Sequence, residues 1–461
     1  RLNPVRVVPA TGDLYLAGEI LMTVTHSAAD GGVATTSSAS ATGDTPQPFR
    51  RTVAKLVANP EALADTGFRV ADAPLNQTYD GGNCDYLVIT NNTLATAFQA
   101  LADHRASHNS YSTEVKTVSS ITAEYAGADT QAKIRNCIID YVENAGTVYV
   151  VLGGDNTVVP DRDCRVAASG NVTNNMPTDL YYAGLDGNWD TDGDGVYGET
   201  EDESASGTDE ADLAADVYVG RIPVRTTAQA DAYINKLIEY ETTPGVAEGI
   251  ARKYLMTGVE TFKMYSGGDR PTDTVPDGHL QFTEHNPVCD AEVTLRRQYR
   301  DAVHPWWRAD TVGLLFDTLT SWDGGTPGDY AASPSHMVNR FNEGWAMVTN
   351  GTHGHGGTLV AENHSFDTSD AAALTGLTPF FYTYACYTGM FDNFEPSLSE
   401  AMLRNGNGGA LLYIGSSRFN YSGTGYRYQE EFLRVVFEDH TTNVGEAFYN
   451  HKASFAAESD N

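Results

Sequence analysis

Two segments in the C-terminal half carry the residue types that nucleophilic catalysis requires. N-G-T-H-G-H-G-G contains His353 and His355, and Y-A-C-Y-T-G-M-F contains Cys386. Each follows an apolar run that predicts a buried strand, so both should lie at strand ends, where α/β proteins bind their ligands. A histidine that removes the thiol proton beside a cysteine that attacks a carbonyl carbon would make a cysteine hydrolase. The alternatives are a buried apolar cysteine and a glycine-rich turn or metal-binding histidine pair.

The acidic run D-T-D-G-D-G-V-Y-G-E-T-E at residues 190–201 carries a second kind of chemistry. It matches D-x-D-x-D-G-x5-E, a pattern in which carboxylates and one backbone carbonyl bind Ca²⁺. The predicted ligands are Asp190, Asp192, Asp194, the Val196 carbonyl and Glu201. No helices of an EF-hand flank the run in the sequence. We therefore expect a structural calcium site without a catalytic role, the alternative being an acidic surface loop that binds no specific ion.

The elements that must position these residues alternate between strand and helix patterns. Apolar runs predict strands at 85–90, 112–119, 147–155, 216–224, 253–260, 312–318, 344–350, 377–386 and 409–417. Helical patterns occur at 93–108, 129–145, 226–242, 397–408, 429–438 and 444–457. Solidly apolar strands that alternate with helices indicate an α/β fold, with one long or two smaller mostly parallel sheets covered by helices on both faces.

The chain divides into three predicted parts. Residues 1–83 hold a short β segment followed by a linker rich in Ala, Gly, Ser and Thr. Residues 84–245 form a first subdomain with the acidic run, and residues 246–461 form a second with the histidine and cysteine segments. The first residue is Arg1 rather than Met, so we expect a processed piece of a longer precursor.

Charge and composition exclude several classes of partner. The 461 residues carry a formal net charge of −32, which repels nucleic acid and anionic lipid. No apolar run reaches the roughly 20 residues that a membrane-spanning helix needs. The chain has five cysteines: Cys84, Cys137, Cys164, Cys289 and Cys386. Four of them would suffice for two disulfides and leave one free thiol. An acidic surface and N-x-Ser/Thr triplets, at Asn350 and Asn420 among others, weakly favour a secreted or cell-surface location.

From about residue 84 to residue 457 the chain resembles the catalytic unit of gingipain-like cysteine peptidases, whose fold is related to that of caspases and legumains. The matching segments stand in family order: Y-L-V-I-T, V-L-G-G-D-N-T-V-V-P-D-R, V-Y-V-G-R-I-P-V, the H-G segment, A-C-x-x-G-x-F, S-E-A and G-G-A-L-L-Y-I-G-S-S. The opening R-L-N-P-V-R-V-V-P-A-T-G-D-L resembles the end of the family's propeptide. The resemblance implies a zymogen-derived thiol protease that acts on proteins or peptides, with its own propeptide or neighbouring precursor domains as further partners.

The resemblance also implies roles for single residues. Cys386 would be the nucleophile, and the backbone N–H groups of Gly354 and Cys386 would form the oxyanion hole. The family's Gly-His-Gly pattern favours His355 as the base, whereas the short distance from the preceding strand favours His353. Asp216 would orient the histidine, or is simply an exposed carboxylate at the start of a strand.

By the resemblance, the family's acidic specificity residue falls near Gln229, which is uncharged, so strict cleavage after Arg or Lys is not expected.

Two function classes follow from these observations. The first is a secreted, calcium-stabilised cysteine endopeptidase that uses a Cys–His thiolate mechanism. The second is a cell-surface or scaffold protein that keeps the peptidase fold with little or only self-processing activity. The presence of Cys386 and both histidines favours the first. A glycosidase is disfavoured because no pair of carboxylates falls on facing strand ends.

Overall fold

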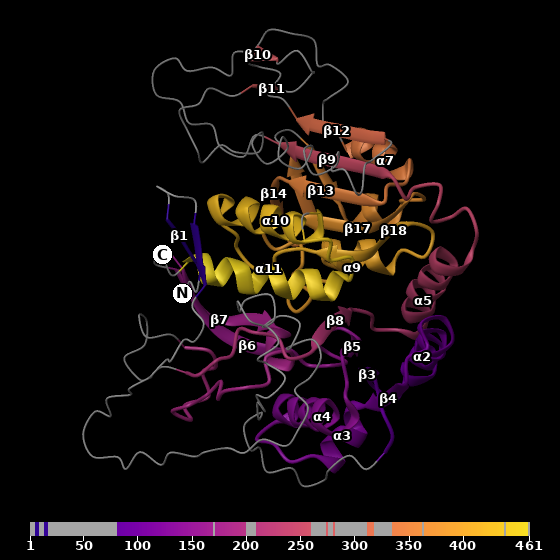
Figure 1. Cartoon of the computed structure of the whole chain (residues 1–461). Coiled ribbons are helices and arrows are strands. Elements are labelled where there is room, and N and C mark those ends of the chain that lie inside the picture. Colours follow the sequence, from indigo (N-terminus) through magenta and orange to yellow (C-terminus); the bar gives the residue numbers. More distant parts are fainter. Residues whose placement is uncertain are drawn as a thin grey trace.

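Two parallel sheets form the framework of the molecule. The computed structural model describes residues 5–8, 13–16, 81–168, 171–199, 209–259, 273–274, 280–281, 311–317, 334–361, 364–437 and 439–459. Within these residues one sheet has the order β4-β3-β5-β8 and the other the order β12-β9-β13-β17-β18. Every neighbouring pair in both sheets is parallel. The predicted α/β fold with mostly parallel sheets is confirmed (Figure 1).

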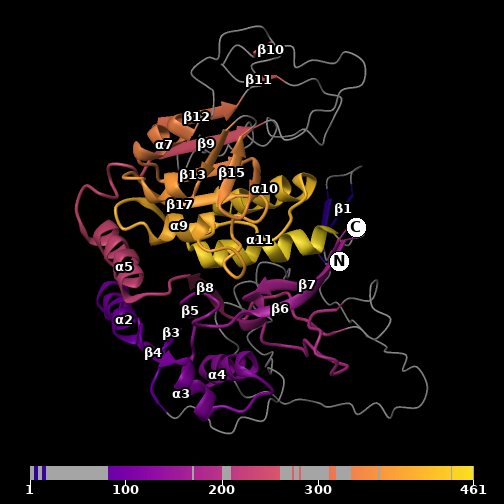
Figure 2. The same ribbon diagram turned by 180° about the vertical axis from the view of Figure 1, so that it is seen from behind.

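The first sheet is built from the N-terminal half of the described chain. Its strands are β3 (Tyr86–Thr90), β4 (Thr113–Thr117), β5 (Tyr149–Gly153) and β8 (Tyr218–Ile222). Its helices are α2 (Ala95–Asn109), α3 (Val118–Glu124), α4 (Thr130–Ala145) and α5 (Thr227–Thr242). Helices α2 and α5 lie on one side of the strands and α3 and α4 on the other, in both views (Figures 1 and 2). The predicted cap of α4 is present, because the Asp129 side chain accepts from the Ala132 N–H.

The second sheet carries the cysteine and histidine segments. Its strands are β9 (Lys253–Val259), β12 (Thr311–Asp317), β13 (Met347–Gly351), β17 (Leu377–Thr383) and β18 (Gly409–Ile414). Its helices are α7 (Pro334–Asn342), α8 (Thr368–Ala372), α9 (Leu398–Arg404), α10 (Ser422–Phe437) and α11 (Val444–Ser459).

Consecutive residues of β17 explain why this strand lacks polar alternation. Phe381 packs edge-to-face against Phe341 of α7. Its neighbours Phe380 and Tyr382 instead contact Phe432 of α10. Because neighbouring side chains point to opposite faces, the strand is buried on both sides.

Short antiparallel pairs and a 3-10 turn are added to this framework. They are β1 (Val5–Val8) with β2 (Asp13–Leu16), β6 (Arg162–Ala168) with β7 (Asn171–Thr178), β10 (Asp273–Thr274) with β11 (Leu280–Gln281), and η2 (Leu180–Tyr182). A further small sheet contains β14 (His353–His355), β15 (Thr358–Ala361) and β16 (His364–Asp367). The histidine segment, expected at the end of a strand, itself forms a strand, since β14 pairs with β15 and the turn falls at Gly356 and Gly357.

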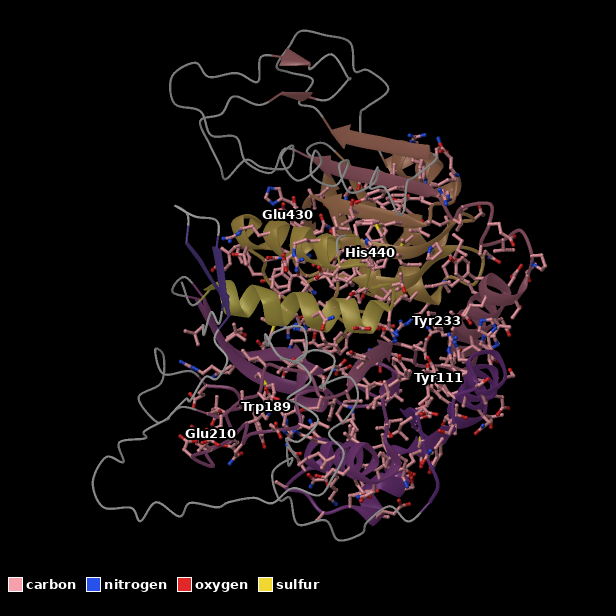
Figure 3. The ribbon with its side chains drawn as sticks, in the orientation of Figure 1. Tyr111, Trp189, Glu210, Tyr233, Glu430 and His440 are labelled. Atoms are coloured by element: carbon pink, nitrogen blue, oxygen red, sulfur yellow. The ribbon has the colours of Figure 1, made fainter. Side chains whose placement is uncertain are left out.

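The two sheets are joined by side chains from α5 and α11. The Tyr449 ring of α11 stacks on Tyr218 of β8. Tyr233 of α5 donates its hydroxyl to the Leu411 carbonyl of β18, over 2.8 Å, where the two parts meet (Figure 3). Lys236 of α5 donates to the carbonyls of Leu403, Asn405 and Gly408. These bonds satisfy carbonyls at the end of α9, which finishes at Arg404 rather than at the predicted Gly408.

In the described part of the chain, no helix combines the length and the apolar character needed to cross a lipid bilayer.

Candidate active site

The carboxyl ends of β13 and β17 bring the histidine and cysteine segments together. The two strands are parallel neighbours in which Asn350 pairs with Thr383. His353 and Cys386 each follow this pair by three residues, so the strand register alone sets them side by side.

Gly354 makes the approach closer still. A Cβ at this position would lie 2.7 Å from both the Ala385 Cβ and the Cys386 carbonyl oxygen. Only glycine lets β14 lie this close to the cysteine segment. The predicted nucleophile, the predicted oxyanion residue and both histidines therefore share one location.

A buried polar cluster fixes the three strand ends beneath this site. Asn350 is fully buried, and its Oδ1 accepts from the hydroxyls of Thr352 (3.0 Å) and Thr383 (2.8 Å). Its Nδ2 donates to the Thr257 hydroxyl of β9 over 2.8 Å. The Thr383 hydroxyl in turn accepts from the Ala385 N–H (3.0 Å), one residue before the cysteine. Buried hydrogen bonds of this kind hold β9, β13 and β17 in one register.

The sulfur of Cys386 is held by the backbone of Asn420. The Asn420 N–H donates to Sγ over 3.3 Å, and the thiol donates to the Asn420 carbonyl over the same distance. The Asn420 side chain is itself fixed, since Nδ2 donates to the Tyr384 carbonyl and to the Ser416 hydroxyl. Two backbone contacts from one residue thus hold the sulfur in a fixed position beside the segment that follows β18.

The chain turns sharply after Cys386. Tyr387 has a φ of 60°, in the left-handed region that residues other than glycine seldom adopt. Its N–H donates to the Arg418 carbonyl (3.0 Å), and the Arg418 guanidinium forms an ion pair with Asp392 (2.6 Å). Arg418 also donates to the Asn175 carbonyl, which ties the turn to β7. Unfavourable backbone held in place by its surroundings is common beside reactive groups.

The other described cysteines have a different environment. Cys84, Cys137 and Cys164 are buried free thiols, whereas Cys386 is partly exposed. Burial raises the pKa of Cys84 and of Cys164 to about 12, so neither is a thiolate at neutral pH. No two of these four described cysteines form a disulfide, and Cys289 lies outside the described residues. The expected disulfides are therefore absent among the four.

Both candidate histidines are exposed on β14. The His355 ring lies between two aromatic rings of the cysteine segment, with centroid distances of 5.9 Å to Tyr387 and 6.3 Å to Phe394. His353 directly precedes Gly354, the residue that touches the Cys386 carbonyl.

Asp216 lies in another environment from the one expected. It is 4% exposed and precedes the amino end of β8, where its Oδ2 accepts from the Leu185 N–H over 2.7 Å. Burial, with Asp186 and Asp212 nearby, raises the pKa of Asp216 to about 7. Its contacts are thus with the segment around residues 183–186 rather than with β14.

Three predicted calcium ligands converge. Asp190, Asp192 and Asp194 each offer an oxygen that lies within 4.8 Å of the other two. The Val196 N–H donates to Asp194 over 2.7 Å, while Glu201 lies outside the described residues. An ion with oxygen ligands at about 2.3–2.6 Å would bridge oxygens at this separation, so the aspartates fit calcium.

The chain beside the three aspartates folds back on itself. The Glu210 N–H donates to the Asn188 carbonyl over 2.9 Å, next to Trp189 (Figure 3). This contact connects the segment that carries the aspartates to the stretch leading to β8.

Sequence patterns missed three residues of the site. Asn350 is the polar last residue of an apolar run, a signal that could have marked it. Asn420 contacts the sulfur through its backbone, and Arg418 binds Asp392 and Asn175, which are distant in sequence, so no local pattern reveals either residue.

Comparison with known proteins identifies the family of the chain. The sequence model of peptidase family C25 matches residues 79–461. Two curated relatives from Porphyromonas gingivalis, Gingipain R2 and Gingipain R1, are each 29% identical over 126 residues, or 26% of this chain. The aligned stretch spans only 17% and 12% of those relatives.

Two solved structures share the fold. One is the complex of the RgpB pro- and mature domains of Porphyromonas gingivalis, with a TM-score of 0.56, 17% identity, and coverage of 81% of this chain and 74% of that one. The other is the Arg-specific cysteine proteinase gingipain R, with a TM-score of 0.56, 18% identity, and coverage of 83% and 75%. With a family match over most of its length and the same fold, the chain belongs to peptidase family C25.

Proposed function

We propose that the chain is a cysteine endopeptidase whose nucleophile is Cys386 and whose general base is His353. The contact of Gly354 with the Cys386 carbonyl carries this proposal, because it sets the residue after His353 directly against the nucleophile. The position of His353, three residues beyond the paired strand ends like Cys386, adds support. His355 is packed between two rings and serves in this proposal as part of the substrate-binding surface.

The residues act in a fixed order. The His353 imidazole takes the thiol proton, and the sulfur attacks the carbonyl carbon of the peptide bond. The N–H groups of Gly354 and Cys386 hold the oxyanion that forms. The C–N bond then breaks, the leaving amine takes the proton from the imidazolium, and a thioester remains on Cys386. Water, deprotonated by His353, hydrolyses the thioester and restores the thiol.

Separate substitutions test these roles. Cys386→Ala should abolish peptide hydrolysis while the fold is retained. His353→Ala should lower kcat by about 10³-fold or more, on the scale of triad substitutions, and His355→Ala should cost much less. Equal and small losses for the two histidine variants would show that the base is misplaced. Activity above a few per cent in a clean Cys386→Ala preparation would overturn the nucleophile.

The acidic segment is proposed to bind structural Ca²⁺. Asp190, Asp192 and Asp194 would hold the ion, with the Val196 carbonyl and Glu201 completing the set. The ion would relieve repulsion among the carboxylates and stabilise this part of the fold.

Location and partners are proposed by analogy. One structurally similar protein was solved as a complex of its pro- and mature domains. By analogy, we propose that the present chain is made as a zymogen whose propeptide covers the active site. Protein substrates and a secreted or cell-surface location follow from the same proposal. Detection of the chain in culture medium or on intact cells would test the location.

A further inference from the structure

Large apolar side chains are exposed at only a few described positions. These are Val166, Val172, Leu213, Phe394 and Phe419. The two phenylalanines lie on the segments that follow Cys386 and β18, and both segments contact the nucleophile. Phe394 is 39% exposed and Phe419 is 57% exposed. Exposed aromatic rings beside a reactive group indicate a surface that is covered when substrate binds.

Phe394 forms a continuous aromatic surface with its neighbours. Its ring lies over the turn after β14, where a Cβ on Gly356 or Gly357 would come within 2.8 Å of it. The His355 ring stands edge-on to Phe394 and tilts toward Tyr387, the residue next to the nucleophile. The surface therefore runs from Cys386 outward along β14.

A second pair of rings lies on the other segment. Phe419 and Tyr421 meet edge-to-face with centroids 4.9 Å apart. Asn420, which stands between them in sequence, contacts the Cys386 sulfur through its backbone N–H and carbonyl. One segment that carries such rings thus follows the nucleophile in sequence, and the other contacts its sulfur through Asn420.

The carboxylates of the cysteine segment are already paired with arginines. Asp392 is bound by Arg418, and Glu395 by Arg404 and Arg225. Gln229 caps α5, and its Oε1 accepts from the Arg225 N–H over 2.8 Å. A basic substrate side chain would have to compete with these arginines for the same oxygens.

A further described acid, Asp163 of β6, lies beside the ion pair of Asp392 and Arg418. It is exposed and lies near Asp392 and Arg418, which act on its pKa in opposite directions. Burial together with Asp392 raises the pKa of Asp163, which weakens its negative charge.

We propose that the rings of Phe394, His355 and Phe419 bind a bulky apolar side chain of the substrate, so that the enzyme cleaves next to aromatic or large aliphatic residues. This assignment rests on the proposed peptidase function. Burying such a side chain against aromatic rings is strongly favourable, whereas the paired acids offer little to a basic one.

Peptides that differ only in the residue before the cut bond test the assignment. Phe and Leu peptides should be cleaved at least about tenfold faster, by kcat/KM, than Arg, Lys or Gly peptides. Phe419→Ala should lower kcat/KM about tenfold for the Phe peptide and less than about threefold for the Gly peptide. Leu213→Ala, which removes an exposed apolar side chain from the stretch before β8, is the matched control and should change neither.

A second pair of variants distinguishes the loss of an apolar contact from local disorder. Because Phe394 packs on the turn after β14, Phe394→Ala is paired with Phe394→Leu, which should restore part of the preference for Phe. Isothermal titration of the Phe and Arg peptides against Cys386→Ala gives a readout that needs no turnover, and the Phe peptide should bind more tightly.

Three results would overturn the assignment. A sharp preference for Arg that Asp163→Asn removes would move specificity to that acid and leave the peptidase function standing. Equal kcat/KM for Phe and Gly peptides in the wild type would show that no apolar site exists. Alkylation of Cys386 by iodoacetamide without cleavage of any peptide would refute the peptidase function itself, and this assignment with it.

Discussion

The buried Asn350 side chain offers a demanding test of how the strand ends position the site. Asn350→Ala removes three hydrogen bonds, to the hydroxyls of Thr257, Thr352 and Thr383. At roughly 1 kcal/mol for each net bond, the free energy of unfolding should fall by about 3 kcal/mol. The Thr352 hydroxyl also loses its acceptor in a buried place, so the loss of stability should not be smaller than this figure.

The substitution should also lower the rate of catalysis. Thr383 positions the Ala385 N–H directly before the nucleophile, and Asn350 stands three residues before His353. A displacement of about 1 Å between base and nucleophile costs on the order of 10²-fold in rate. We therefore expect kcat/KM of the folded Asn350→Ala enzyme to fall about 10²-fold.

Chemical denaturation followed by tryptophan fluorescence would give the stability change, and peptide hydrolysis would give the rate. Thr147→Val is the control, since it removes one buried hydrogen bond, to the Cys84 carbonyl (2.7 Å), next to the first sheet. It should cost about 1 kcal/mol and leave kcat/KM unchanged. Wild-type kcat/KM in a folded Asn350→Ala enzyme would refute the positioning role.

Three further predictions concern other parts of the molecule. Gly354→Ala should lower kcat/KM at least about tenfold, because its Cβ would lie 2.7 Å from the Cys386 carbonyl oxygen, and unchanged hydrolysis would contradict this contact. Burial raises the pKa of Asp216 to about 7, so its contribution to stability is complete below pH ~4 and is lost as pH rises toward 7. Asp216→Asn should therefore gain stability relative to wild type across this window in pH-dependent denaturation, and a constant difference would contradict the raised pKa. Calcium at millimolar concentration should stabilise the folded chain by about 1 kcal/mol and so raise its melting temperature modestly. Asp192→Asn should remove this effect. A melting curve that does not change when a chelator is added would refute the calcium site.

The parallel framework was predictable from sequence because its signal is local. Apolar runs such as 85–90 and 147–155 are too continuous for a half-exposed strand, and the helices between them allow only parallel neighbours. The cap at Asp129 was likewise visible, since capping depends on adjacent residues.

The detail of the site depends on contacts between distant segments. His353 and His355 were expected just beyond the end of a strand, but their backbone pairs with β15 to form a strand of its own. Asp216 stands at a strand start, as predicted, yet its surroundings come from residues 183–186, which nothing in its local sequence reveals. Asn420 contacts the sulfur through its backbone, so its residue type carries no signal.

Site-mapped labelling of the intact chain tests the central claim most directly. A chloromethyl ketone peptide with Phe at its reactive end, followed by mass spectrometry, should modify Cys386 and leave Cys84, Cys137 and Cys164 untouched. His353→Ala should slow this labelling by about 10³-fold, and His355→Ala should slow it far less. Labelling spread over several cysteines, or labelling of Cys386 that both histidine variants leave unchanged, would contradict the proposed Cys386–His353 pair.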